Sequence, residues 1–203
     1  NATTGTWNMD GAFTHTAGGT LNHNNGTVLC DFTADRTWDF ATSETFNNLT
    51  INTSSNTVDL IIASSDNLIV SNNLVLTNGV LTESGAAAKL TAQGNVTVAS
   101  TWDGGSCDIE FTGGAAIQDF DLTGAIALHT APITINKSGG KVRLLSAYTA
   151  GNTVTLTAGE LDLNTFALTC NGAYSQSGGI FTSGSVALDF NNSFTLSGGT
   201  FNA

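Results

Sequence analysis

The sequence predicts an all-β protein, a single-stack parallel β-solenoid with coils of about 20 residues. Three segments recur at a spacing of roughly 20 residues. They are "VTLTAGEL" from Val154, "YSQSGGIF" from Tyr174 and "FTLSGGTF" from Phe194. In each segment apolar and polar residues alternate, which is the period of a strand with one buried face. The chain has 23 glycines and one proline, so we expect glycine and asparagine to make the turns between short strands.

The same pattern of alternation, glycine turn and apolar residue recurs earlier in the chain. In order, the looser copies are "FTHTAGGTL" from Phe13, "LVLTNGVL" from Leu74 and "ITINKSGGKV" from Ile133. A longer echo, roughly 80 residues apart, indicates a larger unit of about four coils. It links "VLCDFT" at Val28, "CDIEFT" at Cys107 and "VALDFN" at Val186. We find no sustained helical stripe, so no helix is expected.

The chain is interpreted as one solenoid domain over residues 1–203, because no linker composition interrupts it. The alternative fold is two β-sandwich domains, which would need antiparallel hairpins with closely spaced turns. The solenoid predicts two adjacent inward ladders, one coil apart. Their members are Val154, Leu156, Tyr174, Gln176, Phe194 and Leu196. If Gln176 points inward, its amide needs a hydrogen-bond partner.

The charge balance argues against two classes of partner. The net charge is −11 and only five residues are Lys or Arg, so phosphate-rich nucleic acid and anionic membrane surfaces are disfavoured. No apolar run approaches the length of about 20 residues that a spanning helix needs, so membrane insertion is not expected. Charged residues make up only 10% of the chain, which leaves a neutral surface of hydroxyl and amide groups.

Runs such as "FNNLTIN", "INKSGGKV" and "NTVTLTAGELDLNTFALTCNG" resemble the β-strand repeats of very large secreted bacterial surface proteins and adhesins. The resemblance covers nearly the whole chain and rests on composition. It implies an extracellular or cell-surface parallel β-helix, and it carries over no functional residue.

Carboxylates at alternate positions are the best local candidates for glycoside chemistry, which uses a carboxyl pair. Asp119 and Asp121 form the clearest pair, and Asp108 with Glu110 and Asp31 with Asp35 have similar spacings. We interpret them as solvated outward positions and do not expect an enzyme. Three cations surround one Gly-Gly turn and are interpreted as exposed charges that discourage edge pairing. They are Lys137, Lys141 and Arg143.

No cofactor or metal is expected. His15, His23 and His129 have no ligand spacing, and the calcium-binding nonapeptide of β-rolls is missing. The three cysteines lie far apart in sequence. Cys30, Cys107 and Cys170 are interpreted as buried small hydrophobes, with one disulfide or a bond between subunits as the alternative.

An exposed indole can stack on a sugar ring, so tryptophans near carboxylates suggest carbohydrate contact. The candidate positions are Trp38, Trp102, Asp119 and Asp121. A carbohydrate-binding or carbohydrate-cleaving β-helix, with surface glycans as partner, is therefore the alternative function. Thr-x-Thr pairs raise ice binding as well. Because the pairs are scattered along the sequence and the coil length drifts, we do not expect the flat array that ice binding needs.

The two ends of the chain both have the composition of internal strands. Joining "SGGTFNA" to the opening "NATTGTWNMDG" reads as an ordinary internal passage, so we expect the chain to be cut from, or built to enter, a longer array. The leading hypothesis is an extracellular structural rod that stacks head to tail with copies of itself or with adjacent repeat segments. The expected contact residues are Trp7, Met9, Phe13, Phe194, Leu196 and Phe201.

Overall fold

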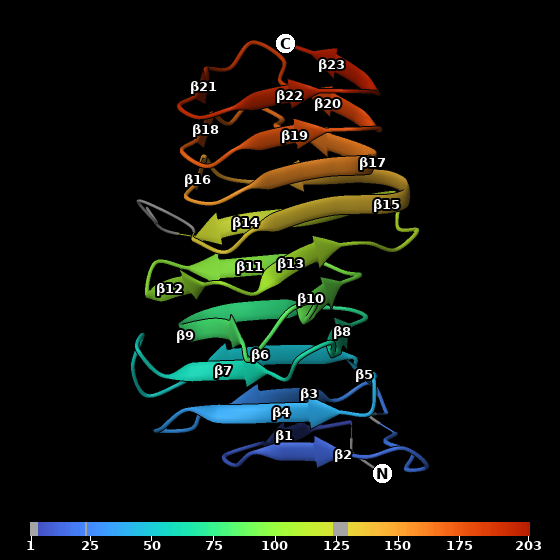
Figure 1. Cartoon of the computed structure of the whole chain (residues 1–203), viewed down its shortest axis with the longest axis vertical. Coiled ribbons are helices and arrows are strands. Elements are labelled where there is room, and N and C mark those ends of the chain that lie inside the picture. The colour runs from blue at the N-terminus through green and yellow to red at the C-terminus, as the bar shows by residue number, and fades with distance from the viewer. Residues whose placement is uncertain (1–3, 23, 124–129) are drawn as a thin grey trace.

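The computed structural model describes residues 4–22, 24–123 and 130–203, which form a β-solenoid of about nine turns with about 21 residues per turn (Figure 1). Strands pair in parallel from one coil to the next, as Trp7 does with Val28 and Tyr174 with Phe194. The solenoid prediction is confirmed, and the β-sandwich alternative, which needs antiparallel hairpins, is wrong. The described residues form no helix, so none of them makes a helix that could cross a membrane.

Each coil passes through three faces in the same order. The first face holds β1 (Thr6–Asn8), β3 (Thr27–Cys30), β6 (Asn48–Asn52), the start of β9 (Leu74–Glu83), β11 (Val96–Ala99), β14 (Ile117–Thr123), the ends of β15 (Ile133–Leu144) and β17 (Val154–Asp162), β20 (Ile180–Thr182) and β23 (Thr200–Asn202).

The second face follows the first along each coil. It holds β2 (Phe13–His15), β4 (Arg36–Phe40), β7 (Asp59–Ile62), the end of β9 and β12 (Trp102–Gly105), and then a three-stranded sheet of β16 (Tyr148–Ala150), β18 (Leu168–Cys170) and β21 (Leu188–Phe190).

The third face completes the coil. It holds β5 (Ser43–Phe46), β8 (Asn67–Val70), β10 (Lys89–Ala92), β13 (Asp108–Phe111), the starts of β15 and β17, β19 (Tyr174–Gln176) and β22 (Phe194–Leu196).

The core consists of inward side chains stacked into ladders along the axis. On the third face one ladder runs through Leu68, Leu90, Ile109, Ile133, Val154, Tyr174 and Phe194. The predicted pair of ladders is confirmed, because Leu156 aligns with Gln176 and Gln176 with Leu196. Gln176 is fully buried, and its amide donates hydrogen bonds to the carbonyl oxygens of Gly179 at 3.3 Å and Thr200 at 3.0 Å.

Glycines stack at the corner between the third and first faces. Gly159, Gly179 and Gly199 lie 20 residues apart and have φ values of +79°, +64° and +81°. A Cβ on Gly179 would lie 2.5 Å from the carbonyl oxygen of Gly159 in the preceding coil. Only glycine fits this left-handed turn without strain, so the predicted use of glycine at turns holds here.

The longer echo of roughly 80 residues is not a structural repeat, so that prediction is wrong. The segment at Val28 lies on the first face, the one at Cys107 leads into the third face, and the one at Val186 leads into the second. The reason is coil length. Leu49 aligns with Leu74, 25 residues later, whereas Tyr174 aligns with Phe194, 20 residues later, so a fixed long spacing does not return to the same face.

Candidate functional site

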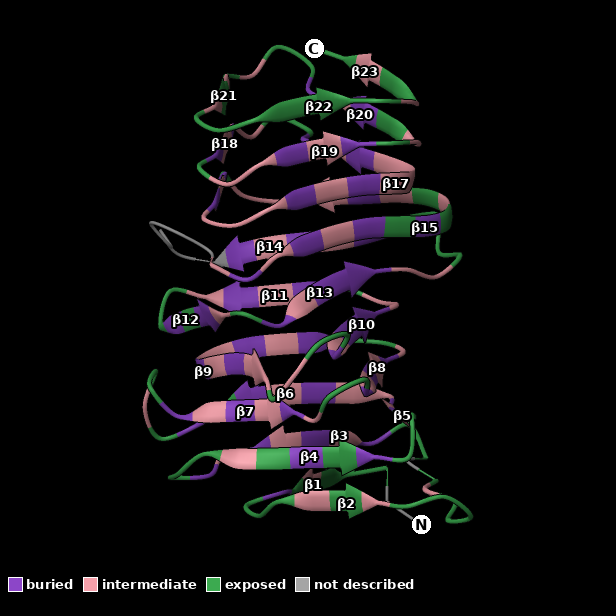
Figure 2. Ribbon diagram, viewed as in Figure 1, coloured by how far each residue is buried: buried purple, intermediate pink, exposed green. Residues whose placement is uncertain are grey.

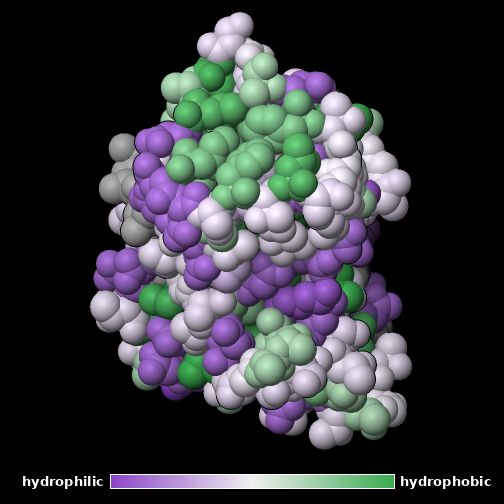
Figure 3. Space-filling model, turned by 45° about the horizontal axis from the view of Figure 1, so that its top comes forward, coloured by the Kyte–Doolittle hydropathy of each residue, from purple (hydrophilic) through white to green (hydrophobic). Residues whose placement is uncertain are grey.

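The C-terminal end of the solenoid presents inward ladder positions that no described coil covers. Phe194 is 42% exposed and Leu196 is 48% exposed, although both continue ladders that are buried one coil earlier. Figure 2 shows β22 and β23 as largely exposed, and Figure 3 shows hydrophobic residues gathered over this end. Among the described strands β22 pairs only with β19 and β23 only with β20, so the outer edge of each strand is open.

An aromatic cluster lies directly under this end. The Phe201 ring stacks on Phe181 with centroids 4.4 Å apart and planes 3° apart, and Phe194 stacks on Tyr174 at 5.3 Å. Phe190 completes the cluster, 4.9 Å from Phe194. The sequence analysis missed Phe190, although its alignment with Cys170 one coil earlier would have placed it inward. The end face, defined here as Phe190, Phe194, Leu196 and Phe201, is therefore apolar and rigidly supported.

The N-terminal end offers strands on two of the same faces. Trp7 in β1 and Phe13 in β2 are partly buried and make an edge-to-face contact at 6.3 Å, while Met9 is buried. Among the described strands β1 pairs only with β3 and β2 only with β4. The chain leaves the C-terminal end on the first face, through β23, and the described N-terminal coil begins on the first face, through β1.

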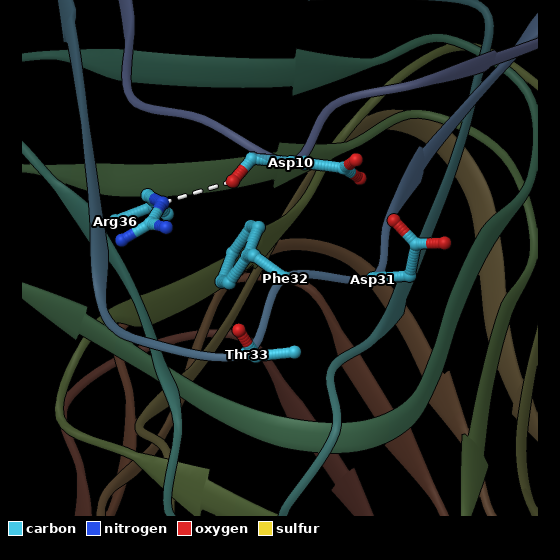
Figure 4. Close-up of a pocket in the computed structure, with 5 residues that line it drawn as sticks. All are labelled: Asp10, Asp31, Phe32, Thr33 and Arg36. Atoms are coloured by element: carbon cyan, nitrogen blue, oxygen red, sulfur yellow. Dashed lines mark hydrogen bonds between the residues drawn. The ribbon is translucent and has the colours of Figure 1, made fainter.

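A small pocket lies beside the first coils, with a volume of about 220 Å³ (Figure 4). Its lining consists of Asp10, Asp31, Phe32, Thr33 and Arg36. A hydrogen bond from the Asp10 carboxyl is the main cause that raises the pKa of Asp31, and Arg36 Nε donates to the Asp10 carbonyl oxygen at 2.9 Å. The two carboxyl groups share a proton more readily than they would apart. No group of three or more potential metal ligands occurs among the described residues.

The two tryptophans proposed for carbohydrate contact lie inside the core. Trp38 is fully buried and packs edge-to-face against Phe13 and Phe46, and Trp102 is also buried. An indole needs an exposed ring face to stack on a sugar. Neither ring offers one, because both occupy inward positions of second-face strands.

The Asp119 and Asp121 side chains point outward from β14, as the alternation predicts, since Phe120 between them is buried. Asp119 pairs with Arg143 one coil later, with 2.8 Å between its carboxylate oxygen and the guanidinium nitrogen. The sequence analysis saw no cation near this pair because Arg143 is 24 residues away. The Asp119 carboxylate is therefore occupied by an ion pair on the side of the rod.

The three cations at the Gly-Gly turn are not equivalent, and the interpretation of Lys137 as an exposed charge is wrong. Lys137 is 1% exposed, and its amine donates to Gln118 Oε1 at 3.0 Å and to the Thr112 carbonyl oxygen at 3.3 Å. Desolvation lowers its pKa. Lys141 does lie near the surface, paired with Asp162 at 2.6 Å. The strand parity places residue 137 inward, which the run of lysine and arginine letters does not reveal.

The remaining titratable candidates have structural roles. All three cysteines are free and buried, as the first interpretation predicts, and burial raises the pKa of Cys170 to about 12. His15 contacts the buried Glu44 carboxylate. Glu110 accepts hydrogen bonds from Lys89 at 2.5 Å and from Asn136 at 2.9 Å. His23 and His129 lie outside the described residues.

Comparison with protein families, with characterised proteins and with solved structures found no match to this chain. The fold and the end face therefore carry the functional argument.

Proposed function

We propose that the chain is an extracellular structural rod that stacks head to tail through its two ends. The observation that carries the proposal is the end face, where inward positions of the core ladders are half exposed beside open strand edges. Open edges of this kind are templates for pairing with another strand, and isolated β proteins usually cover them.

The strand order of the two ends supports a specific register. If β1 of a second copy lies on β23, the inward Trp7 covers the inward Phe201, and Thr6 and Asn8 lie beside Thr200 and Asn202. The following strand of that copy, β2, then lies over β21, which puts Phe13 on Phe190. The third-face position over β22 is filled by the segment that follows β2. All three faces then continue without a change of order.

The gain from such a contact is moderate for each side chain. Full burial of a Leu or Phe side chain contributes about 1.5–3 kcal/mol, and these side chains are already half buried, so each adds about 1 kcal/mol. Main-chain hydrogen bonds along the open edges add direction and register. Because the two contacting surfaces differ, the contact does not close on itself, and repeated addition produces a filament.

The resemblance to bacterial surface proteins and the neutral surface of hydroxyl and amide groups support a cell-surface location. They also support a structural rather than an enzymatic role, since Asp119 is held in an ion pair and both candidate tryptophans are buried. In a longer chain, the same faces would receive an adjacent repeat segment in place of a second copy.

A matched pair of variants tests the proposal. Phe194 at the end face and Ile117 on the side of the rod are both 42% exposed, so Phe194→Asp and Ile117→Asp introduce the same charge at equally exposed apolar sites. We expect the wild type and Ile117→Asp to form filaments with rising concentration, seen by light scattering and electron microscopy. Phe194→Asp should remain a monomer with unchanged far-UV circular dichroism. A monomeric wild type, or equal effects of the two variants, would contradict the proposal.

A further inference from the structure

The outer surface of the third face carries an ordered array of hydroxyl groups in its last four strands. The outward side chains there, including those just outside the strand limits, are neutral. They are Thr134 and Asn136 on β15, Thr153, Thr155 and Thr157 on β17, Ser175 and Ser177 on β19, and Ser193, Thr195 and Ser197 on β22.

The array is regular in both directions. Thr134 aligns with Thr155, Thr155 with Ser175 and Ser175 with Thr195, so these side chains form one column across four coils. Neighbouring strands lie about 4.8 Å apart and alternate residues about 7 Å apart along a strand, which makes the hydroxyls a two-dimensional lattice. The scattered Thr-x-Thr pairs of the sequence are thus collected on one face, because the coil length is constant in this part of the chain.

Contacts beneath and beside the array hold it rigid. The Thr157 hydroxyl donates to the Ile135 carbonyl oxygen at 3.1 Å, and the Ser197 hydroxyl donates to the Gln176 carbonyl oxygen at 3.3 Å. Val154 and Leu156, between the threonines of β17, are fully buried and anchor that strand in the core. Threonine is also stiff at χ1. A rigid surface loses little conformational freedom when it binds.

Charged residues in these coils are placed on the other faces. Glu160 and Asp162 project from the first face at the end of β17, and Asp189 projects from the second face on β21. The same third face carries Lys89 and Asp108 further toward the N-terminus. The low overall charge of the chain therefore does not by itself explain a charge-free array on one face of the last coils.

We propose that this hydroxyl face binds ice. A lattice of neutral hydroxyls fits a partner that is itself periodic and offers both hydrogen-bond donors and acceptors, and the water molecules at an ice surface have both properties. Threonine adds a methyl group beside each hydroxyl, which gives apolar contact between the hydrogen-bonding points. This activity belongs to the side of the rod and does not depend on head-to-tail stacking.

The test is partition of the protein into a slowly growing ice layer, made in the Phe194→Asp background so that filament formation does not influence the result. We expect the protein to be enriched in the ice. Thr155→Lys, in the centre of the array, should lose that enrichment. Thr169→Lys, at an outward position of β18 on the second face, is the matched control and should keep it. Ser175→Thr should increase enrichment.

Three outcomes would overturn the proposal. The first is exclusion of the parent protein from ice to the same degree as an unrelated globular protein. The second is an equal loss in Thr155→Lys and Thr169→Lys while circular dichroism shows both folded. The third is retention on crystalline cellulose that Thr155→Lys abolishes while ice partition is absent, which would assign the array to a crystalline polysaccharide.

Discussion

The Tyr174 hydroxyl donates a hydrogen bond to the side-chain oxygen of Gln176 at 3.0 Å, inside the solenoid core. An apolar ladder thus contains one polar pair whose members satisfy each other. Removing one member leaves a buried polar group unpaired, which costs about 1–3 kcal/mol, whereas replacing both by apolar groups is nearly neutral.

We therefore expect Tyr174→Phe and Gln176→Leu each to lower the free energy of unfolding by about 1–3 kcal/mol. The double variant should lose less than the sum of the two, because the two groups depend on each other. Urea denaturation of the four proteins measures this. Additive losses would show that the pair is not coupled.

The stacked glycine corner predicts a strong positional effect. Gly179→Ala places a Cβ 2.5 Å from a carbonyl oxygen at φ +64°, and we expect a loss of about 1–3 kcal/mol in the free energy of unfolding. Gly139→Ala is the control, since no atom lies within 4 Å of its added Cβ and its φ is ordinary. Equal losses in the two variants would contradict the role of the left-handed turn.

Asp108 predicts a pH dependence of stability. Burial is the main cause that raises its pKa to about 6, above the value of about 3.9 in an unfolded chain. The folded state then holds a proton that the unfolded state has released, so this residue's contribution to stability is greatest below about pH 4 and is lost as the pH rises to about 6.

Asp108→Asn keeps the acceptor for the Thr134 hydroxyl but cannot ionise. We expect the variant to be more stable than the wild type at pH 7, with a smaller fall in stability between pH 4 and pH 6. Thermal unfolding across that range measures the difference. Parallel pH profiles for the two proteins would show that Asp108 titrates normally.

Asp119 and Asp121 test the absence of catalysis. The double variant Asp119→Asn, Asp121→Asn removes one partly exposed ion pair, so we expect the free energy of unfolding to change by less than about 1 kcal/mol. Assays for newly released reducing ends from neutral and acidic polysaccharides should give the same result for both proteins. Cleavage by the wild type that the double variant loses would identify an enzyme.

The local pattern of this chain predicts more than its neighbours across coils. Alternation and the glycine turns place Val154, Tyr174 and Phe194 in one ladder, and the structure confirms it. Contacts between coils depend on the length of each coil, which varies, so the pairing of Asp119 with Arg143 and the gathering of the threonines on one face could not be read from spacing.

Two errors have the same origin. Lys137 was assigned to the surface by its charge and the tryptophans to a possible binding surface by their chemistry, although strand parity decides which way a side chain points. Trp38 follows Thr37 and precedes Asp39 in a strand whose alternate residues are buried, a pattern that already favours an inward indole. The end-face residues Phe194, Leu196 and Phe201 were identified from repetition alone, and their contact with a second copy stays a proposal.

The most direct test of head-to-tail stacking is disulfide cross-linking between Thr6→Cys and Thr200→Cys in one chain. In the proposed register these outward residues lie on neighbouring strands about 4.8 Å apart, within the Cα separation that a disulfide allows. Thr6→Cys with Thr149→Cys is the control, because Thr149 lies on β16, away from the end face. We predict a ladder of covalent oligomers for the first protein under mild oxidation and none for the control. No ladder, or the same ladder in both, would contradict the stacking.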